Sequence, residues 1–154
     1  MIYKKILIAI DESNNSIRAI EKVIDLQKSE NCKVVMFHSI GHPTRPLIAT
    51  VPMASGVGSF NINETELLFE YKEAGNKLLL ARQKLFNNEE LAVEKRLILD
   101  ETPEEYIERI VEEQGFDLVV IGSKGIHSKL SQFLLGSVAQ RVVKHAVCDV
   151  LIVR

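Results

Sequence analysis

The sequence predicts an α/β fold, with a parallel sheet that carries helices on both faces. Apolar segments of strand length alternate with helical patterns along the 154 residues, which is the order of βαβ units. The first segment, Tyr3–Ile10, is continuously apolar toward its end (ILIAI), as expected of a strand covered on both faces. The chain shows no internal repeat and no domain boundary, so residues 1–154 are predicted to form a single domain.

The first helix and the second strand follow directly. Residues 11–16 (DESNNS) interrupt the apolar pattern and include several residue types that cap helices. Ile17, Ile20 and Ile24 then recur at helical spacing, and Asn31 ends the pattern. Lys33–Ile40 contains a second continuous apolar run, which predicts another buried strand.

Residues 41–63 break the alternation of strands and helices. This stretch holds three prolines and three glycines, and Arg45 is its only charged residue. A connection of this length without periodicity is uncommon in a compact domain, and it is typical of a functional lid, a partner surface or a disordered segment. Its apolar residues argue against a purely solvated linker. We expect a long loop, with a lid or partner contact and disorder as open alternatives.

A long helix and a third strand come next. Glu64–Phe86 carries one apolar stripe at helical spacing, although Gly75 lies inside it at some cost in helix stability. Leu91–Leu99 alternates between apolar and polar residues. The third strand is therefore expected near an edge of the sheet.

The third helix has a strong start signal. Thr102 is a good N-cap, Pro103 suits the first helical position, and Glu105 completes a capping box. Gly115 is a plausible C-cap, and the apolar run Leu118–Ile121 predicts the fourth strand. A helix from Ser137 to about His145 and a strand over Val150–Val153 complete the pattern.

Two glycine features lie on the loop after the fourth strand. Gly122 and Gly125 follow the strand, and Gly136 with Ser137 begins the next helix. We call this segment, residues 122–137, the glycine loop. Glycine lets backbone N–H groups approach a ligand, and a helix start offers unpaired N–H donors at its positive end. These features make a candidate phosphate cradle, with ordinary turn and cap glycines as the alternative. The loop matches neither the P-loop pattern nor the dinucleotide fingerprint.

Asp11 is the second candidate site residue. In open parallel sheets, ligands bind beyond the carboxyl ends of the strands, where the strand order reverses. If the first strand pairs with the fourth, Asp11 and Gly122 become neighbours at that edge. The Asp11 carboxylate could then accept hydrogen bonds from ribose hydroxyls or orient a metal ion. Its alternative role is to cap the following helix, and the two roles are compatible.

Composition limits the classes of partner. The net charge of −2 provides no basic field for nucleic acid, and no apolar run approaches the length of a membrane span. Ile6–Ile10 is too short for the apolar region of a signal peptide, so we expect a cytoplasmic protein. Cys32 and Cys148 lack metal-ligand spacing.

Several motifs together resemble one known family. The chain carries KKILIAIDES at its start, HSI after the second apolar run, then TPEEYI, DLVVIGSKG, LLGSVAQRVV and CDVLIV. In these motifs, and along essentially its whole length, it resembles the single-domain universal stress proteins. ATP-binding members carry G-x2-G, nine residues, and then G-[ST], which Gly122, Gly125 and Gly136-Ser137 follow apart from the spacing.

The resemblance implies an open five-stranded parallel sheet in the order 3-2-1-4-5 and a homodimer through the C-terminal strand Val150–Val153. It also implies binding of ATP, alone or with Mg or Mn, and AMP or a cyclic nucleotide is not excluded. The binding residues that it implies lie at the ends of the strands and on the glycine loop: Asp11, Ser39, Gly122, Gly125, Gly136, Ser137 and Val138. No metal ligand is assigned.

The chain departs from the family pattern at three places. Ten residues, Ile126–Leu135, separate Gly125 from Gly136, one more than in the ATP-binding pattern, and the extra residue either bulges outward or pushes into the phosphate site. Ser39 stands where many members have valine. Glu101 stands where glycine is common, and its charge would disfavour phosphates if it pointed inward.

The predicted function is that of a cytoplasmic ATP-binding stress-response or regulatory protein that acts by binding rather than by rapid turnover. Phosphoryl transfer needs a placed metal, cationic groups and a positioned nucleophile, and the sequence shows only fragments of these, so no catalytic residue is assigned. The alternatives are a dimeric interaction protein of the same fold that binds an unknown protein partner rather than nucleotide, and a slow ATP hydrolase.

Overall fold

The computed structural model describes residues 2–40, 48–53, 56–61, 64–124 and 135–154. Its centre is a five-stranded sheet in the order β5-β2-β1-β6-β7, and every neighbouring pair in it is parallel. The strands are β1 (Lys5–Ala9), β2 (Lys33–Ile40), β5 (Glu94–Leu99), β6 (Leu118–Gly122) and β7 (Asp149–Val153). This confirms the predicted parallel sheet and the order 3-2-1-4-5 of its five strands.

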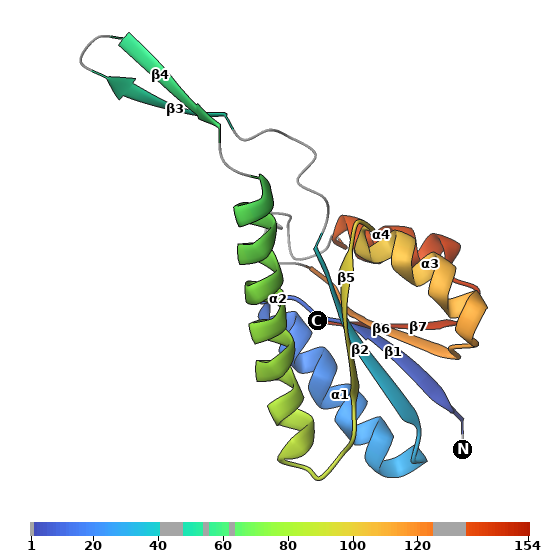
Figure 1. The fold of residues 1–154 in the computed structure, drawn as a ribbon. Helices are drawn as coiled ribbons and strands as arrows, with labels where there is room; N and C mark the ends of the chain where they lie inside the picture. Colours follow the sequence, from blue (N-terminus) through green and yellow to red (C-terminus); the bar gives the residue numbers. More distant parts are fainter. Residues whose placement is uncertain (1, 41–47, 54–55, 62–63, 125–134) are drawn as a thin grey trace.

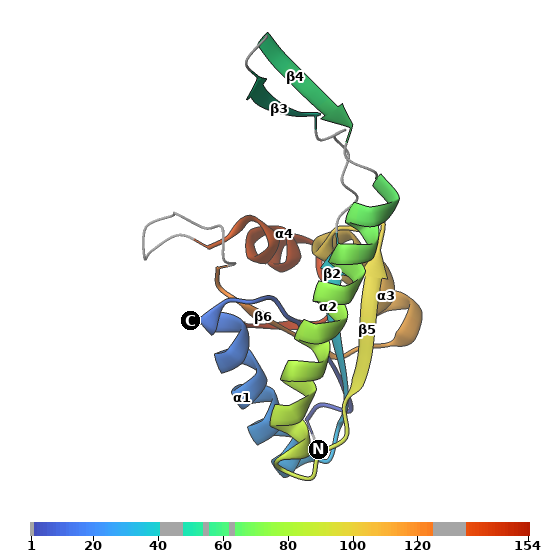
Figure 2. The same cartoon turned by 60° about the vertical axis from the view of Figure 1, so that its left-hand side comes forward.

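The described residues form four helices, which cover both faces of the sheet (Figures 1 and 2). The helices α1 (Asn14–Glu30) and α2 (Glu64–Asn87) lie on one face. The helices α3 (Pro103–Gln114) and α4 (Ser137–His145) lie on the other. In the part of the chain that the model describes, no helix is both long and apolar enough to cross a membrane.

The central strand contributes to a core on each face. Ile6 and Ile8 of β1 join the apolar cluster under α1 and α2, whereas Leu7 joins the cluster under α3 and α4. All three side chains are fully buried. The unbroken apolar run in the sequence therefore reflects a strand that is covered on both sides. As predicted, β5 lies at an edge, and its residues are only partly buried.

Local sequence signals determine where the helices begin and end. Ser13 caps α1 by accepting a hydrogen bond from the Ser16 amide, and Asn31 ends that helix in the left-handed conformation at φ 51°. The predicted capping box of Thr102 and Glu105 is present at the start of α3. Gly115 ends α3 at φ 63°, where a residue without a side chain avoids strain.

The packing of α2 explains the glycine inside this helix. A Cβ atom at Gly75 would lie 2.6 Å from Leu97 Cδ1 and 3.1 Å from Ile40 Cδ1. The helix therefore approaches β5 and β2 closely at this position. A close approach of helix and sheet offsets the lower helix propensity of glycine.

The segment 41–63 holds a regular element that the sequence pattern does not predict. The strands β3 (Ile48–Met53) and β4 (Gly56–Asn61) form a two-stranded antiparallel ribbon. Proline and glycine within these strands interrupt the apolar alternation that normally reveals a strand, and this is why a loop was expected there. The expected alternatives of lid, partner surface and disorder also concern residues 41–47, 54–55 and 62–63, which lie outside the described residues.

Candidate functional site

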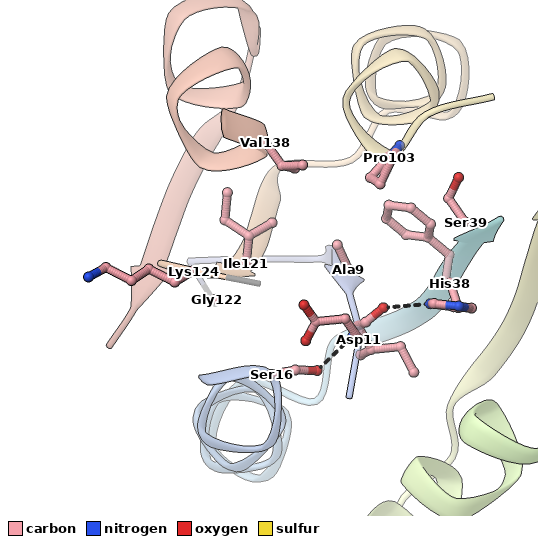
Figure 3. A pocket seen from close by; sticks show the side chains of 12 residues that line it. Ala9, Asp11, Ser16, His38, Ser39, Pro103, Ile121, Gly122, Lys124 and Val138 are labelled. Atoms are coloured by element: carbon pink, nitrogen blue, oxygen red, sulfur yellow. Dashed lines mark hydrogen bonds between the residues drawn. The ribbon is translucent and has the colours of Figure 1, made fainter. Parts of the chain in front are cut away.

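A pocket opens at the carboxyl edge of the sheet, where β1 separates β2 from β6 (Figure 3). This is the point at which the strand order reverses, the usual ligand position in open α/β folds. Its lining comes from the ends of these three strands, from the start of α1 and from the first residues of α3 and α4. The described residues that line it are Ala9, Ile10, Asp11, Ser16, Phe37, His38, Ser39, Pro103, Ile121, Gly122, Lys124 and Val138.

The walls of the pocket are largely apolar. Pro103 and Val138, at the starts of α3 and α4, lie on the same side of the pocket in Figure 3. Phe37 of β2 is held from behind by Tyr106 of α3, with 4.7 Å between the ring centroids and 52° between the ring planes. Side chains packed in this way form a fixed apolar surface, which suits the face of a planar ring.

Asp11 supplies the carboxylate of the pocket. Its Oδ1 atom accepts hydrogen bonds from the amide of Ser13, at 2.9 Å, and from the Ser13 hydroxyl. Its own amide donates to Ser16 Oγ at 3.1 Å. No described residue hydrogen-bonds to Oδ2, and Figure 3 shows the carboxylate directed toward the side where β6 ends. The helix cap itself is Ser13, so Asp11 supports the cap with one oxygen and presents the other to the pocket.

Two side chains, His38 and Arg82, contact the backbone carbonyl groups of Ile10 and Asp11. His38 Nδ1 lies 2.9 Å from the Ile10 carbonyl oxygen, which makes His38 a satisfied structural histidine. Arg82 of α2 places Nη2 3.5 Å from the Asp11 carbonyl oxygen, at the outer limit of a hydrogen bond. Arg82 Nε is buried and has no partner among the described residues. The sequence pattern did not single out Arg82, because its approach to Asp11 is a tertiary contact.

Gly122 packs tightly against the start of α1. A Cβ atom there would lie 3.0 Å from Asn15 Cβ, 3.2 Å from Asn15 C and 3.3 Å from Ser16 N. Two of these neighbours are backbone atoms, which cannot move without shifting the helix. Gly122 is therefore required for close packing, and it also lines the pocket, as the glycine-loop prediction expects.

Ser123 ties the glycine loop to the rest of the sheet edge, and sequence reasoning did not single it out. It is buried, and its hydroxyl accepts a hydrogen bond from Asn15 Nδ2 at 3.1 Å. Its amide donates to the Val153 carbonyl at 2.7 Å, and its own carbonyl accepts from the Gly136 amide at 2.8 Å. The two ends of the glycine loop are thereby joined. Gly125 and the extra residue of the loop fall in residues 125–134, outside the described part of the chain.

The first turn of α4 lies beside the pocket. Gly136 is the N-cap and provides no side-chain hydrogen bond to the helix, so the first-turn amides have no intrahelical acceptor. Val138 in this turn lines the pocket. Gly136 and Ser137 belong to the same helix start but are not among the lining residues. The amide of Gly136 is already used by Ser123.

At the opposite end of the pocket, Ser39 is linked to the turn before α3. Its hydroxyl donates to the Glu101 carbonyl oxygen. The Glu101 carboxylate pairs with the Arg109 guanidinium at 2.9 and 3.1 Å, and this pairing raises the pKa of Arg109. Glu101 is not among the lining residues. Its carboxylate is thus paired with Arg109 of α3.

Asp11 is the only carboxylate among the described residues that line the pocket. No group of three or more histidine, cysteine, aspartate or glutamate side chains that could hold a metal ion is found within the described ranges. Any metal at this pocket would therefore need ligands from a bound molecule or water in addition to Asp11.

The open parallel sheet with a partly apolar pocket at its switch point defines an open α/β fold with a candidate ligand site at the usual position. Comparison with known proteins identifies the family. The model of the universal stress protein family matches residues 2–154, and the chain belongs to this family. The universal stress protein YxiE of Bacillus subtilis is 32% identical over 161 residues, which cover 99% of this chain and 100% of YxiE.

Solved structures share the fold. The hypothetical protein MJ0577 is 25% identical, with a TM-score of 0.78 and coverage of 99% of this chain and 96% of its own. A universal stress protein from Archaeoglobus fulgidus in complex with dAMP is 22% identical, with a TM-score of 0.66 and full coverage of both chains. A further universal stress protein, in complex with cAMP, is 19% identical, with a TM-score of 0.67 and coverage of 100% of this chain and 98% of its own.

Proposed function

We propose that this chain is a cytoplasmic stress-response or regulatory protein that binds an adenine nucleotide, with ATP as its ligand. The observation that carries the proposal is the position of Asp11. Its Oδ2 atom has no hydrogen-bond partner among the described residues, and the carboxylate faces the pocket between the apolar wall at Phe37 and Pro103 and the start of α4. A carboxylate in this position suits the two hydroxyls of a ribose.

The apolar end of the pocket suits the adenine ring. Phe37 and Pro103 provide apolar contacts there, and the end of β2 near Ser39 offers backbone groups for the edge of the base. The nucleotides in the solved A. fulgidus and cAMP-bound proteins share the adenine base. We therefore assign the apolar end of the pocket to the adenine base.

The opposite end of the pocket suits phosphates. Gly122 and Val138 line the pocket, and we assign the phosphates to Gly122, to the first-turn amides at Ser137 and Val138, and to the positive end of the α4 dipole. Gly125 and Gly136 complete the proposed set on the glycine loop. The nucleotides named for the solved relatives are monophosphates, so binding of the triphosphate, alone or with Mg or Mn, is our extension from the glycine pattern.

We propose binding rather than turnover as the mode of action. Phosphoryl transfer depends on an aligned nucleophile, charge-neutralising cations and a metal held in place. Among the described lining residues, Asp11 and Lys124 are the charged groups. Bound nucleotide would join the β1, β6 and α4 ends into one surface, and a homodimer through β7 at the exposed edge of the sheet would transmit that change.

Mass spectrometry of small molecules released from the freshly purified, denatured protein tests the proposal. We expect an adenine nucleotide, or stoichiometric uptake of one after incubation with ATP. GTP at the same concentration serves as the matched control ligand and should be taken up far less. A protein that releases no nucleotide and takes up none would contradict the proposal. Steady phosphate release over many turnovers would instead favour an ATP hydrolase.

A further inference from the structure

We propose that the β3–β4 ribbon is a self-association element, in which β4 pairs with β4 of a second copy of this chain. The proposal concerns a surface away from the pocket and does not depend on nucleotide binding. It rests on the isolation of the ribbon, on its lack of charge and on the order of residues in β4.

The ribbon stands apart from the body of the protein. Figures 1 and 2, viewed 60° apart, both show it projecting beyond the first turn of α2, away from the sheet and the other helices. Its strands pair with each other and with no other strand of the described chain. An isolated two-stranded ribbon is at best marginally stable in water, whereas three or more strands are self-supporting. An additional strand would therefore stabilise the ribbon, and the described chain supplies none.

The two edges of the ribbon differ in their capacity to pair. Each edge of a two-stranded ribbon carries a row of outward N–H and C=O groups. Pro52 lies within β3 and has no N–H to contribute to a ladder. The strand β4, GVGSFN, contains no proline. The β4 edge is thus the one that can form an uninterrupted ladder with a further strand.

The sequence of β4 is complementary to itself. Positions 56, 58 and 60 lie on one face of the strand and hold glycine, glycine and phenylalanine. Two β4 strands related by a two-fold axis normal to the ribbon run antiparallel and place same-face residues opposite each other. With the axis at Gly58, Phe60 stands opposite Gly56 of the second copy. With the axis at Ser59, it stands opposite Gly58 instead.

Both registers thus put phenylalanine and glycine at opposite positions of the two strands, a cross-strand pairing that is favourable at sheet edges. No charged residue occurs from Pro46 through Asn63, although charged residues make up 26% of the chain. Like charges directly opposite each other would oppose such pairing, and edge strands that must stay single usually carry them. The lack of charge removes repulsion between two identical strands, and the order of glycine and phenylalanine in β4 makes a second copy of this chain the complementary occupant.

Charge variants at Ser59 test the proposal, because this position lies on or next to the two-fold axis in both registers. Analytical ultracentrifugation should show that the Ser59→Lys and Ser59→Glu variants each associate at least about tenfold more weakly than the wild type, because identical charges lie directly opposite each other in the Ser59 register and on a diagonal in the Gly58 register. An equimolar mixture of the two variants should recover the association, because opposite charges then meet.

The matched control is Thr50→Lys, which puts the same charge on the partner position of Ser59 in β3, at the other edge. It should associate as the wild type does. Unchanged circular dichroism would show that the body of each variant is folded. The proposal is overturned if the wild type sediments like the Ser59 variants, if the mixture stays dissociated, or if Thr50→Lys weakens association as much as Ser59→Lys.

Discussion

The carbonyl oxygen of Ser123 accepts a hydrogen bond from the amide of Gly136 at 2.8 Å. These two residues stand at opposite ends of the glycine loop, so the bond joins the end of β6 to the start of α4. Ser123 is held in turn by Val153 of β7 and by Asn15 of α1. The ends of the loop are thus tied together whatever its length, and the first turn of α4 lies beside the pocket even though the loop carries one extra residue.

The bond between Asn15 and Ser123 is predicted to stabilise this edge. Replacing either residue by alanine removes one hydrogen bond between α1 and the end of β6, and each replacement should lower the free energy of unfolding by about 1–2 kcal/mol. Urea denaturation of Asn15→Ala, Ser123→Ala and the double variant forms a double-mutant cycle. A coupling energy near zero would show that the hydrogen bond does not contribute.

Gly122→Ala is predicted to destabilise the protein by about 1–3 kcal/mol, because its methyl group meets backbone atoms of Asn15 and Ser16 at 3.2–3.3 Å. Thermal or urea unfolding measures the loss. Gly75→Ala is the informative comparison, because the added methyl group there meets the ends of flexible side chains and helix propensity improves. Gly75→Ala should be milder, and equal losses at the two positions would contradict the packing assigned to Gly122.

The capping box of α3 predicts a pH dependence of stability. Hydrogen bonds from Thr102 lower the pKa of the Glu105 carboxyl in the folded protein below its ordinary value. The stabilisation is therefore fully present above the pKa of the unfolded chain and is lost as the pH falls through the lower folded pKa. Between pH 6 and pH 3, the midpoint temperature of thermal unfolding should fall less steeply for Glu105→Gln than for the wild type. Parallel curves would exclude this contribution.

The Glu101–Arg109 pair predicts an effect on nucleotide binding. In the wild type the carboxylate is held on α3, so Glu101→Gln should leave ATP affinity within about twofold. Arg109→Ala leaves the Glu101 carboxylate without this partner near the turn that borders the pocket. The substitution should weaken the binding of ATP more than that of adenosine, because the carboxylate repels the phosphates. Titration calorimetry of both ligands measures this difference. The double variant should restore ATP affinity, and a persistent loss would point to another role for Arg109.

Local and topological features could be predicted well from the sequence. The capping residues of α1 and α3 act within a few positions of each other, and the continuous apolar runs report strands buried on both faces. The strand order followed from the family resemblance, and it brings Asp11 and Gly122 to one edge.

Contacts between distant segments could not be predicted. The packing of Gly122 on Asn15 and the approach of Arg82 to Asp11 depend on how α1 and α2 lie on the sheet. The β3–β4 ribbon escaped detection because Pro52, Gly56 and Gly58 remove the periodicity of a strand. Among the predicted site residues, Asp11, Ser39, Gly122 and Val138 line the pocket. The binding roles of all seven predicted residues stay proposals.

Titration calorimetry of ATP into the wild type and Asp11→Asn tests the nucleotide site most directly. The substitution preserves the shape of the side chain but removes the charged acceptor that we assign to the ribose. It should lower the affinity for ATP by roughly 10–100-fold. Asp25→Asn, which makes the same change at an exposed position of α1, should bind as the wild type does. Equal affinities for all three proteins, or no ATP binding by the wild type, would contradict the account.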